Sequence, residues 1–259
     1  MVDHVTRGTV GVEHVIPPCR VTASDLTEPA TLEPALAGAK ALFLLLSADL
    51  HDPGATAPAE IVARAAAGGV RRVVLLSTQG VATRPYGATR ITMRALEERI
   101  QESGMEWSVL RPGGFASNAL WWAPSVRTRR VVAAPFADVG VPVVDPWDIA
   151  DVAAACLLED RHLGGVYELT GPQVITPRRQ ARTIATALGA PLRFHDLTRE
   201  EAKAAMTRAM PAELADDTLD ILGAPTEAER RVGPAVRQVL NRPARPFADR
   251  VSRDIAAFR

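Results

Sequence analysis

The sequence has little cysteine, and that shortage excludes two classes of site. Cys19 and Cys156 are the only cysteines in 259 residues. They are too few and too far apart for a disulfide framework or a cysteine-based metal site. Cys156 lies in the apolar, helix-like stretch Asp151–Leu158. We therefore expect a thiol packed in the core and not a nucleophile.

The chain also carries no formal net charge at pH 7. Thirty basic residues balance thirty acidic ones, which removes the electrostatic reason to expect a nucleic acid or an anionic membrane as partner. A neutral small molecule or a cofactor fits this composition better. The sequence has no HExxH motif, no Ser/His/Asp order and no clustered histidines and carboxylates. It therefore predicts neither a hydrolase nor a metal site.

Nothing in the sequence indicates a membrane span or a leader. The apolar run Ala41–Leu46 is much shorter than the roughly 20 residues that cross a bilayer. The first residues do not combine a basic segment with an apolar one. We expect a cytoplasmic protein whose partner is a small molecule, and a homo-oligomer is compatible with the composition.

Strand-like and helical patterns alternate in the first half of the chain. The continuous apolar run Leu42–Leu46 indicates a strand buried on both faces, and Val70–Ser77 and Met105–Leu110 indicate two more strands. Helical patterns separate them at Pro58–Ala67, which ends at two glycines, and at Tyr86–Ser103. This alternation predicts an α/β fold with a doubly wound, mostly parallel sheet.

The second half is mainly helical. Helix and strand patterns follow in the order Asp145 to about Glu159 (helix), Gly165–Thr170 (strand) and Thr176 to just before Gly189 (helix). Thr198 with Glu201, and Thr226 with Glu229, have the spacing of a capping box, so we predict that a helix begins at each.

Several motifs together resemble the NmrA-like, atypical short-chain dehydrogenase/reductase family, from about Ser24 to Phe258. The motifs are Ser24–Gly38 leading into Ala41–Leu46, Leu76–Gly80, Trp107–Phe115 with Asn118, Trp147–Val152 and Tyr167–Pro172. The resemblance implies a Rossmann-like domain over residues 1–150 and an interleaved, mainly helical substrate lobe over 151–259. It also implies an NAD(P)H-linked activity, often on quinones or other conjugated carbonyl compounds.

The phosphate loop departs from the family pattern. Its only candidate is Gly8-Thr9-Val10-Gly11, and Met1–Val5 before it makes a poor buried strand. Only 12 residues lie between Gly11 and Ser24, and Pro17-Pro18 interrupts them. A typical helix of about 11 residues and a strand of five or six do not fit in that length. We predict that residues 1–23 form no complete βαβ unit, with a stub helix and at least one edge element lost.

Candidate nucleotide contacts follow from the resemblance and from the rule that ligands bind at the carboxyl ends of parallel strands. They are Gly8, Thr9, Val10, Gly11, Asp25, Leu26, Leu46, Ser47, Ser77, Thr78, Arg90, Pro112 and Gly113. Asp25 has two equally weighted interpretations, a neighbour of the adenine or a cap of the following turn. The degenerate loop leaves the choice between NAD and NADP open.

Candidate substrate contacts follow the third strand: Gly114, Phe115, Asn118, Trp121 and Trp122. Adjacent tryptophans cannot both point inward from one helix face. One indole is expected to line a cleft for a flat aromatic ligand while the other packs against the lobe. Two core or interface tryptophans are an equally weighted alternative.

Tyr86 and Arg90 have the spacing of the Tyr-x-x-x-Lys motif of short-chain dehydrogenases, with arginine in place of lysine. Arginine does not give up its proton, but it can hold a ribose or a phosphate. Tyr86 is a candidate proton donor, although a loop or helix-start tyrosine is the favoured alternative. For a quinone acceptor no strong general acid is required.

Three hypotheses about function follow. The leading one is an NAD(P)H-linked oxidoreductase acting on a quinone or an aromatic, polyketide-like compound. The second is a natural-product tailoring enzyme, an oxygenase or coupling enzyme, for which nicotinamide is dispensable. The third is a non-catalytic, nucleotide-sensing regulator.

Overall fold

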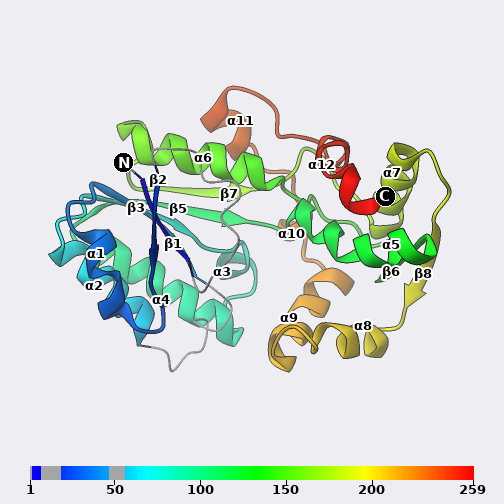
Figure 1. Cartoon of the computed structure of the whole chain (residues 1–259), viewed down its shortest axis with the longest axis horizontal. Helices are drawn as coiled ribbons and strands as arrows, with labels where there is room; N and C mark the ends of the chain where they lie inside the picture. The colour runs from blue at the N-terminus through cyan, green and yellow to red at the C-terminus, as the bar shows by residue number, and fades with distance from the viewer. Residues whose placement is uncertain (1, 7–18, 47–55) are drawn as a thin grey trace. The chain divides into compact units, whose positions relative to one another are not determined.

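The computed structural model describes residues 2–6, 19–46 and 56–259. By backbone contacts the chain divides into two compact units that interleave along the sequence (Figure 1). Unit 1 comprises Met1–Ser77, Pro85–Leu110 and Cys156–Val166, and unit 2 comprises Thr78–Arg84, Arg111–Ala155 and Tyr167–Arg259.

The main sheet has four strands in the order β3-β4-β5-β7. The strands are β3 (Ala41–Leu45), β4 (Arg72–Leu76), β5 (Glu106–Pro112) and β7 (Gly165–Leu169). Strands β3, β4 and β5 run parallel, with Leu45 opposite Leu76 and Leu76 opposite Leu110. The α/β class with a mostly parallel, Rossmann-like sheet is confirmed.

Burial separates the central strand from the edge strand. Val73, Val74 and Leu75 of β4 have no exposed side-chain surface, as expected for a strand covered on both faces. Phe43 and Leu45 of β3 are 39% and 55% exposed. The expectation of two buried faces is therefore wrong for β3, because among the described residues little packs on the face that carries Phe43 and Leu45.

Unit 1 has helices close to the two predicted ranges Pro58–Ala67 and Tyr86–Ser103, and a further short helix precedes them. They are α1 (Glu33–Leu36), α2 (Ala57–Ala67) and α4 (Ala88–Glu102). Helix α2 carries Pro58 in its first turn and ends at Gly68. Its buried residues Ile61, Val62 and Ala65 share one face, and α2 packs against α4 (Figure 1).

The N-terminal residues form a parallel pair, β1 (Val2–Thr6) and β2 (Cys19–Ala23), in a two-stranded sheet of their own. Both strands are present, so the expected loss of an edge element is wrong for the strands. Hydrogen bonding between parallel backbones does not require apolar side chains, which is why Val2–Thr6 forms a strand despite Asp3 and His4. The predicted stub helix and the loop Gly8-Thr9-Val10-Gly11 lie outside the described residues.

Unit 2 is mainly helical, and it holds a second parallel pair, β6 (Val131–Pro135) with β8 (Arg193–Leu197). Helix α6 (Pro146–Leu158) runs from unit 2 into unit 1. The other helices are α3 (Gly80–Thr83), α5 (Ala123–Arg129), α7 (Pro177–Leu188), α8 (Arg199–Met206), α9 (Ala212–Gly223), α10 (Glu227–Arg230), α11 (Ala235–Leu240) and α12 (Phe247–Arg253).

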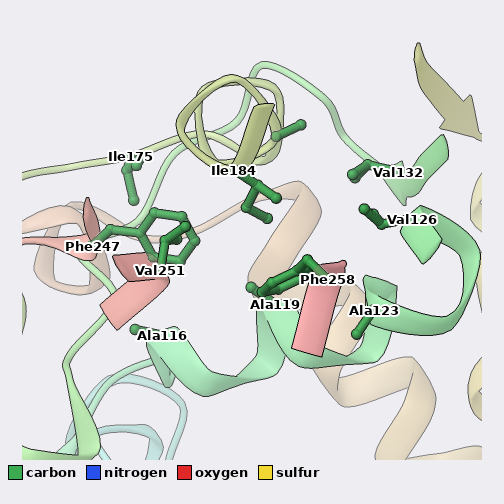
Figure 2. Packing of buried hydrophobic residues seen from close by; sticks show 11 residues of the cluster. Ala116, Ala119, Ala123, Val126, Val132, Ile175, Ile184, Phe247, Val251 and Phe258 are labelled. Atoms are coloured by element: carbon green, nitrogen blue, oxygen red, sulfur yellow. The ribbon is translucent and has the colours of Figure 1, made fainter. Parts of the chain in front are cut away.

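A cluster of alanine, branched aliphatic and aromatic side chains forms one core of unit 2 (Figure 2). Ala116, Ala119 and Ala123 follow one another at helical spacing and contribute to the same core as Phe247 and Phe258. Because alanine leaves room beside the backbone, the bulky rings can occupy the space that these residues free.

Two local expectations are confirmed, the capping boxes and the buried cysteine. Thr198 and Thr226 each close a reciprocal capping box, with Glu201 and Glu229 respectively. Cys156 is fully buried, and burial raises the pKa of its thiol to about 11, so the thiol is protonated and inert at neutral pH. Among the described residues, no helix has the length and apolar character needed to cross a membrane.

Candidate active site

In unit 1, the carboxyl end of β4 presents a buried serine. The Ser77 backbone N–H donates to Leu110 O at 2.7 Å, which continues the pairing of β4 with β5 by one residue. The Ser77 hydroxyl donates to Oε1 of Glu97 on α4. Ser77 is 7% and Glu97 2% exposed. This polar pair is therefore almost fully buried.

Leu46 follows β3 in the same way and is buried. Ser47, predicted to contact the nucleotide beside it, lies outside the described residues. Since parallel strands end at the same edge of a sheet, Leu46 and Ser77 mark one end of unit 1.

Tyr86 and Arg90 lie in opposite environments. Helix α4 begins at Ala88, so Tyr86 stands in the turn before it and is 93% exposed. Arg90 lies in the first turn of α4 and is only 6% exposed. The structure therefore buries the cationic member of the motif and leaves the tyrosine in solvent.

Asp25 caps a turn. Its Oδ1 accepts from the backbone N–H of Thr27 at 2.8 Å and from the Thr27 hydroxyl at 2.7 Å. Its backbone N–H donates to Thr31 Oγ1 at 2.9 Å. The capping interpretation thus describes what this carboxylate does here, while contact of Asp25 and the half-buried Leu26 with adenine stays a prediction.

In unit 2, the segment after β5 is held against the segment after β4. Gln79 N donates to Pro112 O at 2.9 Å, and Gly113 N donates to Leu169 O at 3.0 Å. A Cβ at Gly113 would lie 3.2 Å from Oε1 of the buried Gln79, so the position has little room for a side chain. The structure thus brings the predicted residues Pro112 and Gly113 next to Gln79, and Thr78 directly precedes it. Glycine at position 113 lets the two segments approach closely.

The predicted substrate residues divide by environment. Gly114 and Phe115 are tied to Val144, which exchanges backbone hydrogen bonds of 2.8 Å with Gly114 and Ala116. Trp122 packs against the unit 2 core, whereas Trp121 is 60% exposed and Asn118 is exposed. Ala116, Ala119 and Ala123 form the face that packs on the core. Trp121 is exposed because it does not lie on that face.

Two residues that sequence reasoning missed stabilise this part of unit 2. Thr83 and Arg84, at the end of α3, both donate to the carboxylate of Glu229 on α10. Glu97 in unit 1 was missed as well. Its signal was present, because Met93, Leu96, Glu97 and Ile100 follow the helical apolar spacing, which marks Glu97 as inward-facing.

Metal-binding geometry is not found in the described ranges, where no three His, Cys, Asp or Glu side chains gather as ligands. The described residues do fit a nicotinamide nucleotide. In unit 1, the Ser77 hydroxyl follows the carboxyl end of a central parallel strand, and the guanidinium of Arg90 is buried in the first turn of α4. In unit 2, Gly113 permits close backbone approach.

Comparison with known proteins agrees with this geometry. Residues 6–160 match a family model described as NAD(P)H-binding. A (4-alkanoyl-5-oxo-2,5-dihydrofuran-3-yl)methyl phosphate reductase from Streptomyces griseus is 38% identical over 232 residues, which cover 88% of this chain and 80% of the relative. An NAD(P)H azoreductase from Xenophilus azovorans is 32% identical over 92% of this chain and 84% of its own.

Among solved structures, the NADPH-dependent quinone oxidoreductase QOR2 of Escherichia coli, complexed with NADPH, is similar in fold. Its TM-score is 0.74 and its sequence identity 25%, over 91% of this chain and 83% of that one.

Proposed function

Because the chain belongs to the NAD(P)H-binding family and is an NAD(P)H-linked oxidoreductase of the atypical short-chain dehydrogenase/reductase type, we propose that it reduces a quinone or an aromatic, polyketide-like carbonyl compound. Family membership supports this hypothesis over a tailoring enzyme for which nicotinamide is dispensable. The reductase names of its relatives support it over a non-catalytic regulator.

The observation that favours a quinone is the exposure of Tyr86. A general acid must be held within hydrogen-bond reach of the atom that it protonates. Tyr86 is 93% exposed, and arginine replaces the lysine of the family motif. A quinone accepts a hydride without such an acid, because the driving force lies in the substrate. The named substrates of the relatives, quinones and a 5-oxo-dihydrofuran, are likewise conjugated acceptors.

In this proposal the two units have separate roles. Residues of unit 1, chiefly Leu46, Ser77 and Arg90, bind the nucleotide together with the glycines of the loop Gly8–Gly11. Within unit 2, Pro112 and Gly113 are proposed nucleotide contacts, and Gly114, Phe115, Asn118 and Trp121 are proposed substrate contacts. The bound nucleotide supplies the hydride, and the protein orients it and excludes water. The cytoplasm, where this cofactor is recycled, is the proposed compartment.

Titration with NADH and NADPH, followed by calorimetry or fluorescence, tests the nucleotide part. We expect submillimolar binding of at least one of them, and oxidation of that nucleotide when a quinone is added. Absence of binding to both would overturn the proposal and favour the tailoring enzyme.

The buried guanidinium of Arg90 gives a second test. If it holds the ribose or a phosphate, Arg90→Ala should weaken nucleotide binding by about 1.5 to 3 kcal/mol, the range for a hydrogen bond to a charged group. Arg90→Lys should recover part of the loss, and Arg99→Ala, an exposed position on the same helix, is the control. Unchanged affinity in a folded Arg90→Ala protein would assign this arginine a structural role.

The paired tryptophans give a third test. Trp121→Ala should weaken binding of a planar quinone by about 1 to 3 kcal/mol through lost aromatic packing and buried area, with nucleotide affinity unchanged. Trp122→Ala should lower the melting temperature instead, since Trp122 packs against the core. Equal quinone affinity in Trp121→Ala and wild type would place the substrate contacts elsewhere.

A further inference from the structure

Glu97 is a buried carboxylate with no assigned role in the proposed reaction. It lies on the apolar face of α4 between Met93, Leu96 and Ile100, and it is 2% exposed. Placing a carboxyl group in such surroundings is unfavourable unless it is hydrogen-bonded. An alanine or leucine at this helix position would fill the same face at no such cost. The Glu97 carboxylate lies beside the carboxyl end of β4, where it accepts a hydrogen bond from Ser77.

The contact between Glu97 and Ser77 restricts what the serine can do. A serine hydroxyl has one hydrogen to donate and two lone pairs that accept, whereas an ionised carboxylate only accepts. The single hydrogen of Ser77 is given to Glu97 Oε1. Toward any ligand at the end of β4, Ser77 therefore presents lone pairs. The Ser77 hydroxyl therefore cannot donate to a carbonyl oxygen of such a ligand, but it can accept from an N–H or O–H of the ligand.

We propose that Glu97 is a positioning residue that fixes Ser77 as a hydrogen-bond acceptor for the carboxamide NH2 of the nicotinamide ring. The inference rests on the proposed function, because it requires a bound nicotinamide nucleotide. The carboxamide is the N–H donor attached to the reactive ring. An acceptor fixed in direction sets the rotation of that group and limits which face of the ring is open to the substrate.

Glu97→Gln and Ser77→Ala test this assignment by ligand discrimination and not by turnover. The amide introduced by Glu97→Gln can donate to the Ser77 hydroxyl and turn its hydrogen outward, whereas Ser77→Ala removes the hydroxyl. Glu98→Gln is a matched control, since Glu98 is the exposed neighbour on α4. Ser108→Ala is the other, since Ser108 is fully buried in β5 and donates to His162 O at 2.7 Å. Melting temperatures establish that each protein is folded.

Calorimetry then compares three ligands. The first is the parent nucleotide, NADPH or NADH, whichever wild type binds more tightly. The second is the 3-acetylpyridine analogue of that nucleotide, which has a methyl group in place of the NH2, and the third is the corresponding ADP-ribose, which lacks the nicotinamide. Wild type and both controls should bind the analogue about tenfold more weakly than the parent nucleotide, the effect of one lost hydrogen bond. Glu97→Gln and Ser77→Ala should bind the two nucleotides within about twofold of each other. All five proteins should bind the ADP-ribose equally.

Each other outcome overturns the assignment. Discrimination that persists in Ser77→Ala shows that another group accepts from the carboxamide. If both variants bind ADP-ribose more weakly than wild type, Ser77 contacts a ribose hydroxyl and not the carboxamide. If only Ser77→Ala loses the discrimination between the two nucleotides, Glu97 does not position Ser77. Wild type that binds neither NADH nor NADPH overturns the proposed function itself, a result separate from the others.

Discussion

Glu229→Ala is expected to lower the free energy of unfolding by about 3 to 5 kcal/mol, the range for removing one partner of a buried ion pair. The Glu229 side chain is 4% exposed. It accepts from Arg84 Nε at 2.8 Å and Nη2 at 2.9 Å, from Thr83 Oγ1 at 2.8 Å and from the Thr226 N–H at 2.8 Å. The alanine variant leaves all of these donors without the carboxylate. Urea denaturation measures the loss, with the exposed Glu227→Ala on the same helix as control.

The contribution of Glu229 should also depend on pH. Burial raises its pKa, but the hydrogen bonds from Arg84, Thr226 and Thr83, with the charge of Arg84, outweigh burial and lower the pKa below the usual value. Stability from a carboxyl group with a lowered folded-state pKa is present above the unfolded-state value of about 4.3 and lost as the pH falls through the folded-state value. The difference between wild type and Glu229→Ala should be constant above about pH 6 and shrink below about pH 4. A difference that grows in acid would contradict this account.

Gly171→Ala is expected to destabilise the protein by about 3 kcal/mol or more, because the added atom meets backbone and not a movable side chain. A Cβ at Gly171 would lie 2.1 Å from Val143 O and 3.0 Å from its carbonyl carbon. Gly171 N also donates to Pro142 O at 3.1 Å, which fixes the two segments at this separation.

Gly114→Ala is the matched control for that clash. A Cβ there would lie 3.7 Å from Val143 Cγ1, an ordinary van der Waals contact with the same neighbour. Thermal melting should therefore separate the two variants clearly. A Gly171→Ala protein as stable as Gly114→Ala would mean that the segment at Val143 moves aside freely.

The sequence predicted the elements that local patterns encode. Strand β4, helix α2 and both capping boxes were recognisable because apolar periodicity, a proline in the first turn and Thr/Glu spacing act within a few residues. The pair β6 with β8 was not predicted as a sheet, because Val131 and its partner Arg193 are distant in sequence and pairing depends on the whole fold.

The candidate site was predictable in position but not in environment. The ends of β3, β4 and β5 mark where ligands bind in an open parallel sheet. Nothing local distinguishes the exposed Tyr86 from the buried Arg90, or Trp121 from Trp122, since burial depends on what packs from elsewhere in the chain. Glu97 and Glu98 are the same residue type, and only the helical spacing of the apolar neighbours indicates that Glu97 is the buried one.

The interleaving of the two units has a consequence for dissecting the protein. The chain passes between the units five times, at Ser77, Arg84, Leu110, Ala155 and Val166. A fragment ending at residue 150 would lose Cys156–Val166 from unit 1, including Asp160, whose carboxylate accepts from Arg72 at 2.5 Å, and His162, whose carbonyl accepts from Ser108. No single cut yields a free-standing half. Nucleotide binding and substrate binding therefore cannot be assigned by truncation, and point substitution in the whole chain is the route to each.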